Sequence, residues 1–308
     1  MPNYVTNILE IKATGSHLEE ILDAIRFEDG PKGTIDFNRL IPMPASLDLT
    51  QGSITHSSTE AFISNLQREY FAHKGSREIS LEEQNKILLY TNAYHMLHRM
   101  GFSRPKGNMS EEEIEAEANR NDMTTESFLA LGKQYLDNII EHGAPTWYDW
   151  RITNWGTKWN LNPESCIQAN ENTLTFETAW SAPYPILDRI SQMFPDVVLY
   201  HEWADEDLGH NVGSASYQNG NVIQEYIPEP GSKEAYDLAF RIDGTTAADH
   251  CLIYDENEGT YVYSEELAMQ EREAFEKARS LAGQLEDAQK RATEQGSGKT
   301  EPENEPTR

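Results

Sequence analysis

Tyr-Val-Thr-Asn-Ile-Leu-Glu-Ile-Lys-Ala, residues 4–13, is the stretch from which the fold can be worked out. Its aliphatic and β-branched residues are typical of a strand, and Thr14 and Gly15 break the pattern. Apolar residues then recur at spacings of three and four, which predicts a helix directly after the strand. The chain therefore opens with a strand followed by a helix.

Residues 34–41 predict a second strand, which would complete a strand, helix, strand unit. Apolar residues recur along this stretch, and Pro42 and Pro44 after it favour an extended exit. Beyond the prolines the pattern changes to apolar spacings of three and four, which predict helices. The helical stretches are residues 58–74, 80–100 and 125–141. We expect them to form one helical insertion.

Strand character returns at residues 173–180, where apolar and polar residues alternate. A helix over residues 184–194 and a strand over residues 197–203 follow, and the dipeptide Asn219-Gly220 predicts a hairpin after them. Strand, helix, strand, interrupted and then repeated, is the order of a split βαβ sheet. The predicted fold class is α+β: a ferredoxin-like split βαβ antiparallel sheet with a helical insertion and a C-terminal helix.

The predicted division of the chain follows these elements. Residues 1–57 and 146–230 are the two halves of the ferredoxin-like domain, and residues 58–145 are the helical insertion between them. Residues 231–294 are a C-terminal extension with a long charged helix. Residues 295–308 are rich in Gly, Ser, Pro and Glu and are predicted to be a disordered tail.

The formal net charge of the chain is −27 at pH 7. Phosphate binding depends on Lys and Arg, which release counterions, so this acidity disfavours direct binding to nucleic acid. It favours a protein partner with a basic surface, although acidity can also serve solubility alone. No stretch approaches the roughly 20 apolar residues of a membrane helix, and the first residues lack a signal-peptide pattern, so no membrane contact and a cytoplasmic location are predicted.

The common motifs of catalysis and cofactor binding are missing from the sequence. Its two cysteines, Cys166 and Cys251, lie far apart, and it has no Gly-rich phosphate loop or nucleophile elbow. No catalytic residue, metal or cofactor is predicted, and a non-enzymatic protein is favoured over an enzyme. An acidic and imidazole group at residues 201–210 could hold a divalent cation, but its spacing departs from the calcium-loop pattern.

All six tryptophans lie in three short blocks, at residues 147–160, 176–183 and 203–213. Aromatic clusters of this kind usually form the core, because each large ring buries much apolar area. The alternative is a groove in which exposed rings frame a ligand or partner and polar neighbours anchor it. The candidate binding residues are Trp155, Lys158, Trp159, Glu177, Trp180, Asp205, Glu206, Asp207 and Asn211.

The same blocks and the N-terminal part carry a family resemblance. Its segments are Met-Pro-Asn-Tyr-Val-Thr-Asn at residues 1–7, Phe-Asn-Arg-Leu-Ile-Pro-Met-Pro at 37–44, Trp-Gly-Thr-Lys-Trp-Asn at 155–160, Phe-Glu-Thr-Ala-Trp-Ser-Ala-Pro at 176–183, and residues 205–213. In these segments the chain resembles the YubB-type ferredoxin-like domain proteins of bacteriophages, plasmids and bacterial genomic islands. The resemblance implies the ferredoxin-like topology without an iron-sulfur cluster, and it implies no activity.

Two functional hypotheses follow from the sequence. The leading one is a non-enzymatic binding or regulatory protein of a mobile genetic element, which acts through protein–protein contact and could interfere with host defence. The alternative is a small-molecule binder or hydrolase that uses the tryptophan, lysine and acidic cluster near the sheet. The alternative requires a concave site beside the sheet, and it fails if Trp155, Trp159 and Trp180 are fully buried with no adjoining cavity.

Overall fold

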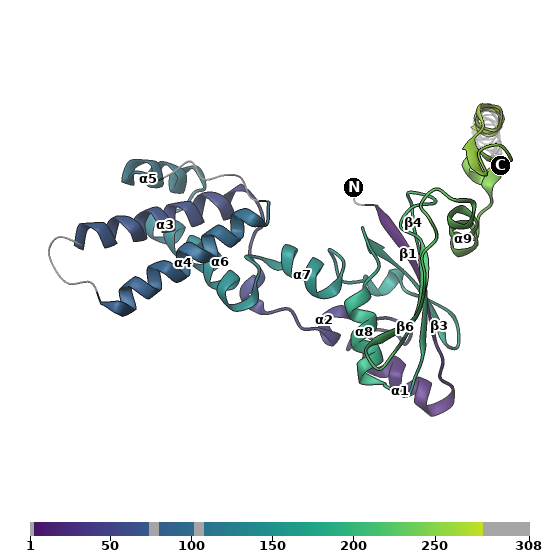
Figure 1. Cartoon of the computed structure of the whole chain (residues 1–308), viewed down its shortest axis with the longest axis horizontal. Coiled ribbons are helices and arrows are strands. Elements are labelled where there is room, and N and C mark those ends of the chain that lie inside the picture. Colours follow the sequence, from purple (N-terminus) through teal and green to yellow (C-terminus); the bar gives the residue numbers. More distant parts are fainter. Residues whose placement is uncertain (1–2, 74–79, 102–107, 280–308) are drawn as a thin grey trace, which may run out of the picture.

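The computed structural model describes residues 3–73, 80–101 and 108–279. The molecule is elongated, with a helical insertion at one end and a sheet domain at the other (Figure 1). Helix α7 (Trp147–Trp155) lies between these two parts. The chain therefore leaves the sheet domain, builds the insertion and returns through α7.

A six-stranded antiparallel sheet forms the centre of the sheet domain, in the order β2-β3-β1-β4-β5-β6. The strands are β1 (Tyr4–Ile11), β2 (Ile167–Asn170), β3 (Thr173–Ala179), β4 (Leu199–Asp205), β5 (Gly213–Gln218) and β6 (Asn221–Tyr226). β1 pairs with both β3 and β4, so Asn7 lies opposite Phe176 on one side and Trp203 on the other. The first four strands have the ferredoxin-like order, which confirms the predicted α+β fold class.

The prediction of a strand over residues 34–41 is wrong. This stretch contains the short helix α2 (Phe37–Leu40), whose first and last residues are both buried. The Asp36 side chain accepts a hydrogen bond from the backbone N–H of Asn38 and so caps the helix. The second strand of the split βαβ unit is β2, which follows the insertion. The insertion therefore separates the first helix from β2.

Helices cover both faces of the sheet. Helices α1 (Gly15–Ile25), α2 and α8 (Tyr184–Met193) lie on one face, and α9 (Lys233–Asp243) lies on the other (Figure 1). The burial of β1 alternates along the strand, because successive side chains point to opposite faces. Val5, Leu9 and Ile11 belong to the main core under α1 and α8.

A polar network lies inside this core. Asn7 Nδ2 donates to Thr178 Oγ1 at 2.9 Å, and Asn7 Oδ1 lies 3.0 Å from His201 Nε2. The His201 ring is stacked on Trp203, with the ring centroids 5.2 Å apart. Burial lowers the pKa of His201 to about 3, so the ring is neutral and its Nε2–H donates to Asn7.

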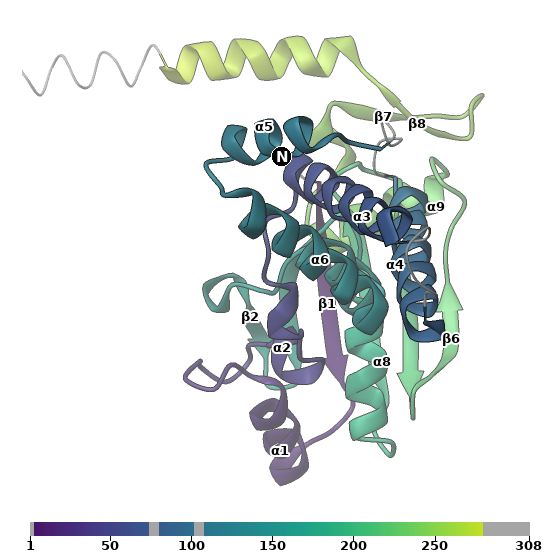
Figure 2. The same ribbon diagram turned by 90° about the vertical axis from the view of Figure 1, so that its left-hand side faces the viewer.

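The helical insertion contains α3 (Ser53–His73), α4 (Leu81–Arg99), α5 (Glu111–Arg120) and α6 (Thr125–His142). Seen from its own end in Figure 2, the insertion stacks α3, α4 and α6 together, with α5 against α3 and α6. Two small cores of its own hold it, around Leu97 and Leu136 and around Phe128 and Ala118. None of the helices within the described ranges is long and apolar enough to cross a membrane.

The hairpin predicted at Asn219 and Gly220 is confirmed, since both residues have positive φ and connect β5 to β6. After α9, strands β7 (Leu252–Asp255) and β8 (Thr260–Tyr263) form a separate two-stranded sheet. Residues 265–279 are helical, as predicted for the start of the charged C-terminal helix. The rest of that helix and the predicted disordered tail lie outside the described residues.

Candidate functional site

Helix α7 divides the tryptophan-rich segment into a buried part and an exposed part. Trp155 is 1% exposed, and its Nε1 donates to the carbonyl oxygen of Ile41 at 2.9 Å. Gly156 then takes φ +80° and ends the helix, and a Cβ at this position would meet Pro185 at 2.8 Å. Trp155 therefore lies in the core, whereas the residues after Gly156 turn to the surface.

Residues at the surface around this turn form a cluster that we call the lysine cage: Tyr148, Lys158, Trp159 and Trp180. The Lys158 ammonium lies 5.6, 4.7 and 4.8 Å from the ring centroids of Tyr148, Trp159 and Trp180. Trp159 is 36% exposed and Trp180 is 39% exposed. Within the described ranges Lys158 has no ion pair, so the rings are its neighbours. Such contacts are attractive because the ring faces are electron-rich.

The backbone of Trp180 is held in an uncommon conformation. Its φ is +72°, a region that residues other than glycine rarely adopt. Its N–H donates to the carbonyl of Asn3 at 2.8 Å, and its carbonyl accepts from Asn211 Nδ2 at 3.3 Å. The buried hydroxyl of Thr157 donates to the carbonyl of Ala179 at 2.8 Å, which joins the Lys158 loop to the end of β3. Hydrogen bonds thus tie the Lys158 loop and Trp180 to their neighbours, and Tyr148 joins the cage through ring contacts.

Three acidic residues lie beside the cage: Asp205 is buried and holds its neighbours in place, whereas Glu206 and Asp207 are exposed. Asp205 is 6% exposed and accepts hydrogen bonds from Asn211 Nδ2 at 2.9 Å, from the Asp207 N–H at 2.9 Å and from Asn3 Nδ2 at 3.3 Å. Glu206 and Asp207 are exposed. Asp205 therefore positions Asn211, and through it Trp180, while the two outer carboxylates face solvent.

A groove of about 270 Å³ begins at Trp159 and runs along the end of β3. Its wall includes the exposed carboxylate of Glu177 and the ring of Tyr4, whose strand pairs with β3. Asn160, also in the wall, donates to Asp36 at 2.8 Å and accepts from the N–H of Phe37 at 2.9 Å, which joins a segment before the insertion to a segment after it. Trp159 and Glu177 thus share one concave site beside the sheet.

Tyr4, Tyr148 and Asn160 are site residues that the sequence reasoning missed. Tyr148 and Asn160 both lie in the tryptophan-rich block, so the block itself was the available signal. Tyr4 lies in the first segment of the family resemblance and reaches the site only through the pairing of β1 with β3.

The acidic and imidazole group at residues 201–210 does not converge on one point. His201 lies in the core under α8, whereas Glu202 lies on the other face and accepts from Arg241 Nη1 at 2.8 Å. Burial alone would raise the pKa of Glu202, but hydrogen bonds from Arg241 and Tyr200 lower it. Neighbouring residues of a strand point to opposite faces, so the strand itself separates these groups. The described part of the chain contains no cluster of three or more potential metal ligands.

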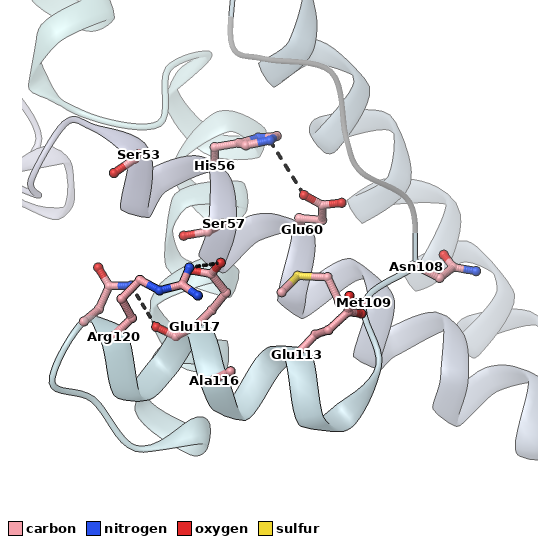
Figure 3. Close-up of a pocket in the computed structure, with 11 residues that line it drawn as sticks. Ser53, His56, Ser57, Glu60, Asn108, Met109, Glu113, Ala116, Glu117 and Arg120 are labelled. Atoms are coloured by element: carbon pink, nitrogen blue, oxygen red, sulfur yellow. Dashed lines mark hydrogen bonds and ion pairs between the residues drawn. The ribbon is translucent and has the colours of Figure 1, made fainter.

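A second cavity, of about 540 Å³, lies in the helical insertion between α3 and α5 (Figure 3). Most of the residues that line it are polar or charged: His56 lies 3.7 Å from Glu60, and Arg120 pairs with Glu117. No sequence pattern predicted it, because it forms where two helices far apart in the sequence face each other.

Residues 154–246 match the family described as "Ferredoxin-like domain in Api92-like protein". The match begins inside α7 and ends after α9, and it contains all nine candidate binding residues. The crystal structure of the protein Api92 from Yersinia pseudotuberculosis is similar at 12% identity and a TM-score of 0.33, over 75% of this chain and 100% of that chain. The search of curated proteins gave no match.

Proposed function

We propose that this chain is a non-enzymatic binding protein that takes a partner protein at the lysine cage. One observation carries the proposal: the fold buries Trp155 and Trp203 to 1% and 2% exposure but leaves Trp159 and Trp180 more than one third exposed. Rigid, exposed tryptophans are typical anchors of protein interfaces, where covering them gives a large gain in buried area.

The charge of the chain supports a partner with a basic surface. The net charge is −27, and the exposed Glu177, Glu206 and Asp207 add local negative potential around the cage. Complementary charge speeds association and disfavours acidic partners. The resemblance to YubB-type proteins supports a place on a mobile genetic element, where a host-defence protein would be a fitting partner.

Affinity capture from a host lysate tests the proposal with three forms of the full chain. We expect the wild type to retain a specific protein partner in a salt-sensitive manner, and the double variant Trp159→Ala/Trp180→Ala to lose it. The control is Val222→Ala/Ile223→Ala, which trims two exposed apolar residues on the edge strand β6. The same partners with all three forms, or no specific partner with the wild type, would contradict the proposal.

The groove beside the cage favours a second candidate, the binding of a small molecule. Its volume of about 270 Å³ is close to the lower end of ligand pockets, roughly 300–1,000 Å³. Trp159 offers a stacking surface, and Glu177 and Asn160 offer polar groups for orientation. Thermal-shift screening of the wild type against Glu177→Gln tests this candidate, since a ligand of the groove would stabilise the two forms unequally.

A further inference from the structure

The Lys158 ammonium lies among the three rings of the cage, where a cationic ligand would bind. The three rings around its ammonium come from different segments: Tyr148 from α7, Trp159 from the loop after it and Trp180 from the end of β3. Tyr148 and Trp180 also meet edge to face, with their centroids 6.1 Å apart. The arrangement shows that the cage accepts a cation at its centre.

One wall of the cage, Trp180, is fixed through its backbone before any partner arrives. Trp180 is held by Asn3 and Asn211, and the buried Asp205 holds Asn211 in turn. A site with preformed walls loses little conformational entropy on binding. By contrast, Lys158 is held only by the rings, since it forms no hydrogen bond or ion pair within the described ranges. The occupant is therefore easier to displace than the walls.

Arginine is the side chain best suited to displace a lysine from these rings. Its guanidinium is planar and more weakly hydrated than an ammonium, so it stacks on aromatic faces at a smaller desolvation cost. The exposed carboxylate of Glu177 lies in the groove that begins at Trp159, where it can pair with a second cation of the same segment. A phosphate or carboxylate ligand would instead approach a chain of net charge −27.

The geometry points to the lysine cage as the binding site for an arginine side chain of the partner protein, with Lys158 as a displaceable internal occupant. This inference rests on the proposed function and adds the chemistry that the site recognises. It predicts competition: removal of Lys158 empties the cage and raises the affinity for arginine. A cationic ligand therefore binds only if its affinity for the rings is high enough to displace Lys158.

Peptide titration of the full chain, followed through the indole N–H signals of Trp159 and Trp180 in NMR spectra, tests the inference. The probes are the capped peptides Gly-Arg-Gly, Gly-Lys-Gly and Gly-citrulline-Gly, the last of which keeps the shape of arginine without its charge. We expect saturable shifts with the arginine peptide, weaker binding of the lysine peptide and none of the citrulline peptide. Trp180→Ala should abolish the binding.

Two lysine variants separate competition from net charge. Lys158→Ala should tighten binding of the arginine peptide about fivefold, as expected when an internal competitor is removed. The control, Lys12→Ala, removes one positive charge at a lysine that pairs with Glu10 and lies 5.9 Å from the Tyr200 ring. Equal affinities of the two variants, or equal binding of the citrulline or lysine peptide, would overturn the inference.

Peptide binding and partner capture can fail independently, so the two experiments test the inference and the proposed function separately. If the arginine peptide does not bind while Trp159→Ala/Trp180→Ala still loses the captured partner, the inference fails and the proposed function stands. If the peptide binds as expected while capture is unchanged by the double variant, the cage recognises arginine but the proposed partner site is elsewhere.

Discussion

Two cation–aromatic clusters include residues of α7, and they differ in burial. Arg151 lies 5.0 Å from the Trp147 ring and 4.9 Å from the Trp155 ring, and Trp155 is part of the main core. Lys158 lies among rings that remain open to solvent. The same type of contact thus supports the fold in one place and leaves a surface available for binding in the other.

The difference arises from how each cluster is connected. Trp155 contacts Phe37 edge to face and donates to the Ile41 carbonyl, so it joins the segment before the insertion to the segment after it. Trp180 contacts Tyr148 and Lys158 and is supported mainly through its backbone. Loss of the Trp155 ring would break a contact that holds the fold together, whereas loss of the Trp180 ring would remove only contacts at the surface.

The largest effect expected is that of Trp155→Ala, which should destabilise the protein by about 3–5 kcal/mol. The substitution leaves a cavity in the core and an unpaired carbonyl at Ile41. Trp180→Ala, the matched change in the exposed cluster, should cost far less. Urea unfolding measures both, and similar losses of stability for the two variants would refute the contrast between core and surface.

The buried His201 should also make the stability of the protein depend on pH. Burial lowers the pKa of His201 to about 3 in the folded state, whereas an unfolded histidine titrates near pH ~6.5. Below pH ~6.5 the unfolded state therefore binds more protons at this histidine, so the contribution of His201 to stability falls by up to about 1.4 kcal/mol per pH unit on acidification and is constant above that range. His201→Gln, which keeps an N–H near Asn7, should flatten this slope.

The matched control for the pH measurement is His210→Gln, at a surface histidine whose side chain is 51% exposed. Unfolding curves at pH 5, 6 and 7 for the wild type and both variants give the slopes. The same slope in wild type and His201→Gln would show that another group carries the pH dependence.

The two cations, Arg151 and Lys158, should differ in how much each stabilises the protein, by a smaller amount. Arg151→Met should cost about 1–2 kcal/mol, because the guanidinium is partly desolvated between two indoles, and burial lowers its pKa. Lys158→Met should cost about 0.5 kcal/mol or less, since its cluster is open to water. Urea unfolding again measures both variants. An equal cost would mean that Lys158 is as structural as Arg151.

Much of the fold could be predicted from local patterns. Alternation identified β3, and the Asn219-Gly220 dipeptide identified the hairpin, because these signals are local. Residues 34–41 misled the prediction because their apolar spacings suit either a strand or one helical turn. The cap by Asp36 and the burial of both ends of α2 stabilise the helix over the strand.

The site was predictable in composition but not in exposure. The tryptophan blocks contain all four cage residues, yet Trp155 and Trp159, four residues apart, end on opposite sides of the core boundary. The turn at Gly156 and the positive φ of Trp180 make that division, and no periodicity in the sequence reports either. Asp205 is a support and not a surface group for the same reason: its partners lie on distant segments.

The hydrogen bonds of Asn211 give a further test of how the exposed cluster is held. Asn211→Ala should cost about 1–2 kcal/mol, because alanine at φ +43° is strained, and Asn211→Gly should cost less. Both variants remove the hydrogen bonds to Trp180 and Asp205 and should make the Trp180 indole more mobile in NMR relaxation. Asn219→Ala, at φ +50° in the distant hairpin, should carry a similar strain without loosening the indole. An unchanged Trp180 in all three variants would mean that the ring contacts alone hold the cage, so that its walls and its lysine would be equally easy to displace.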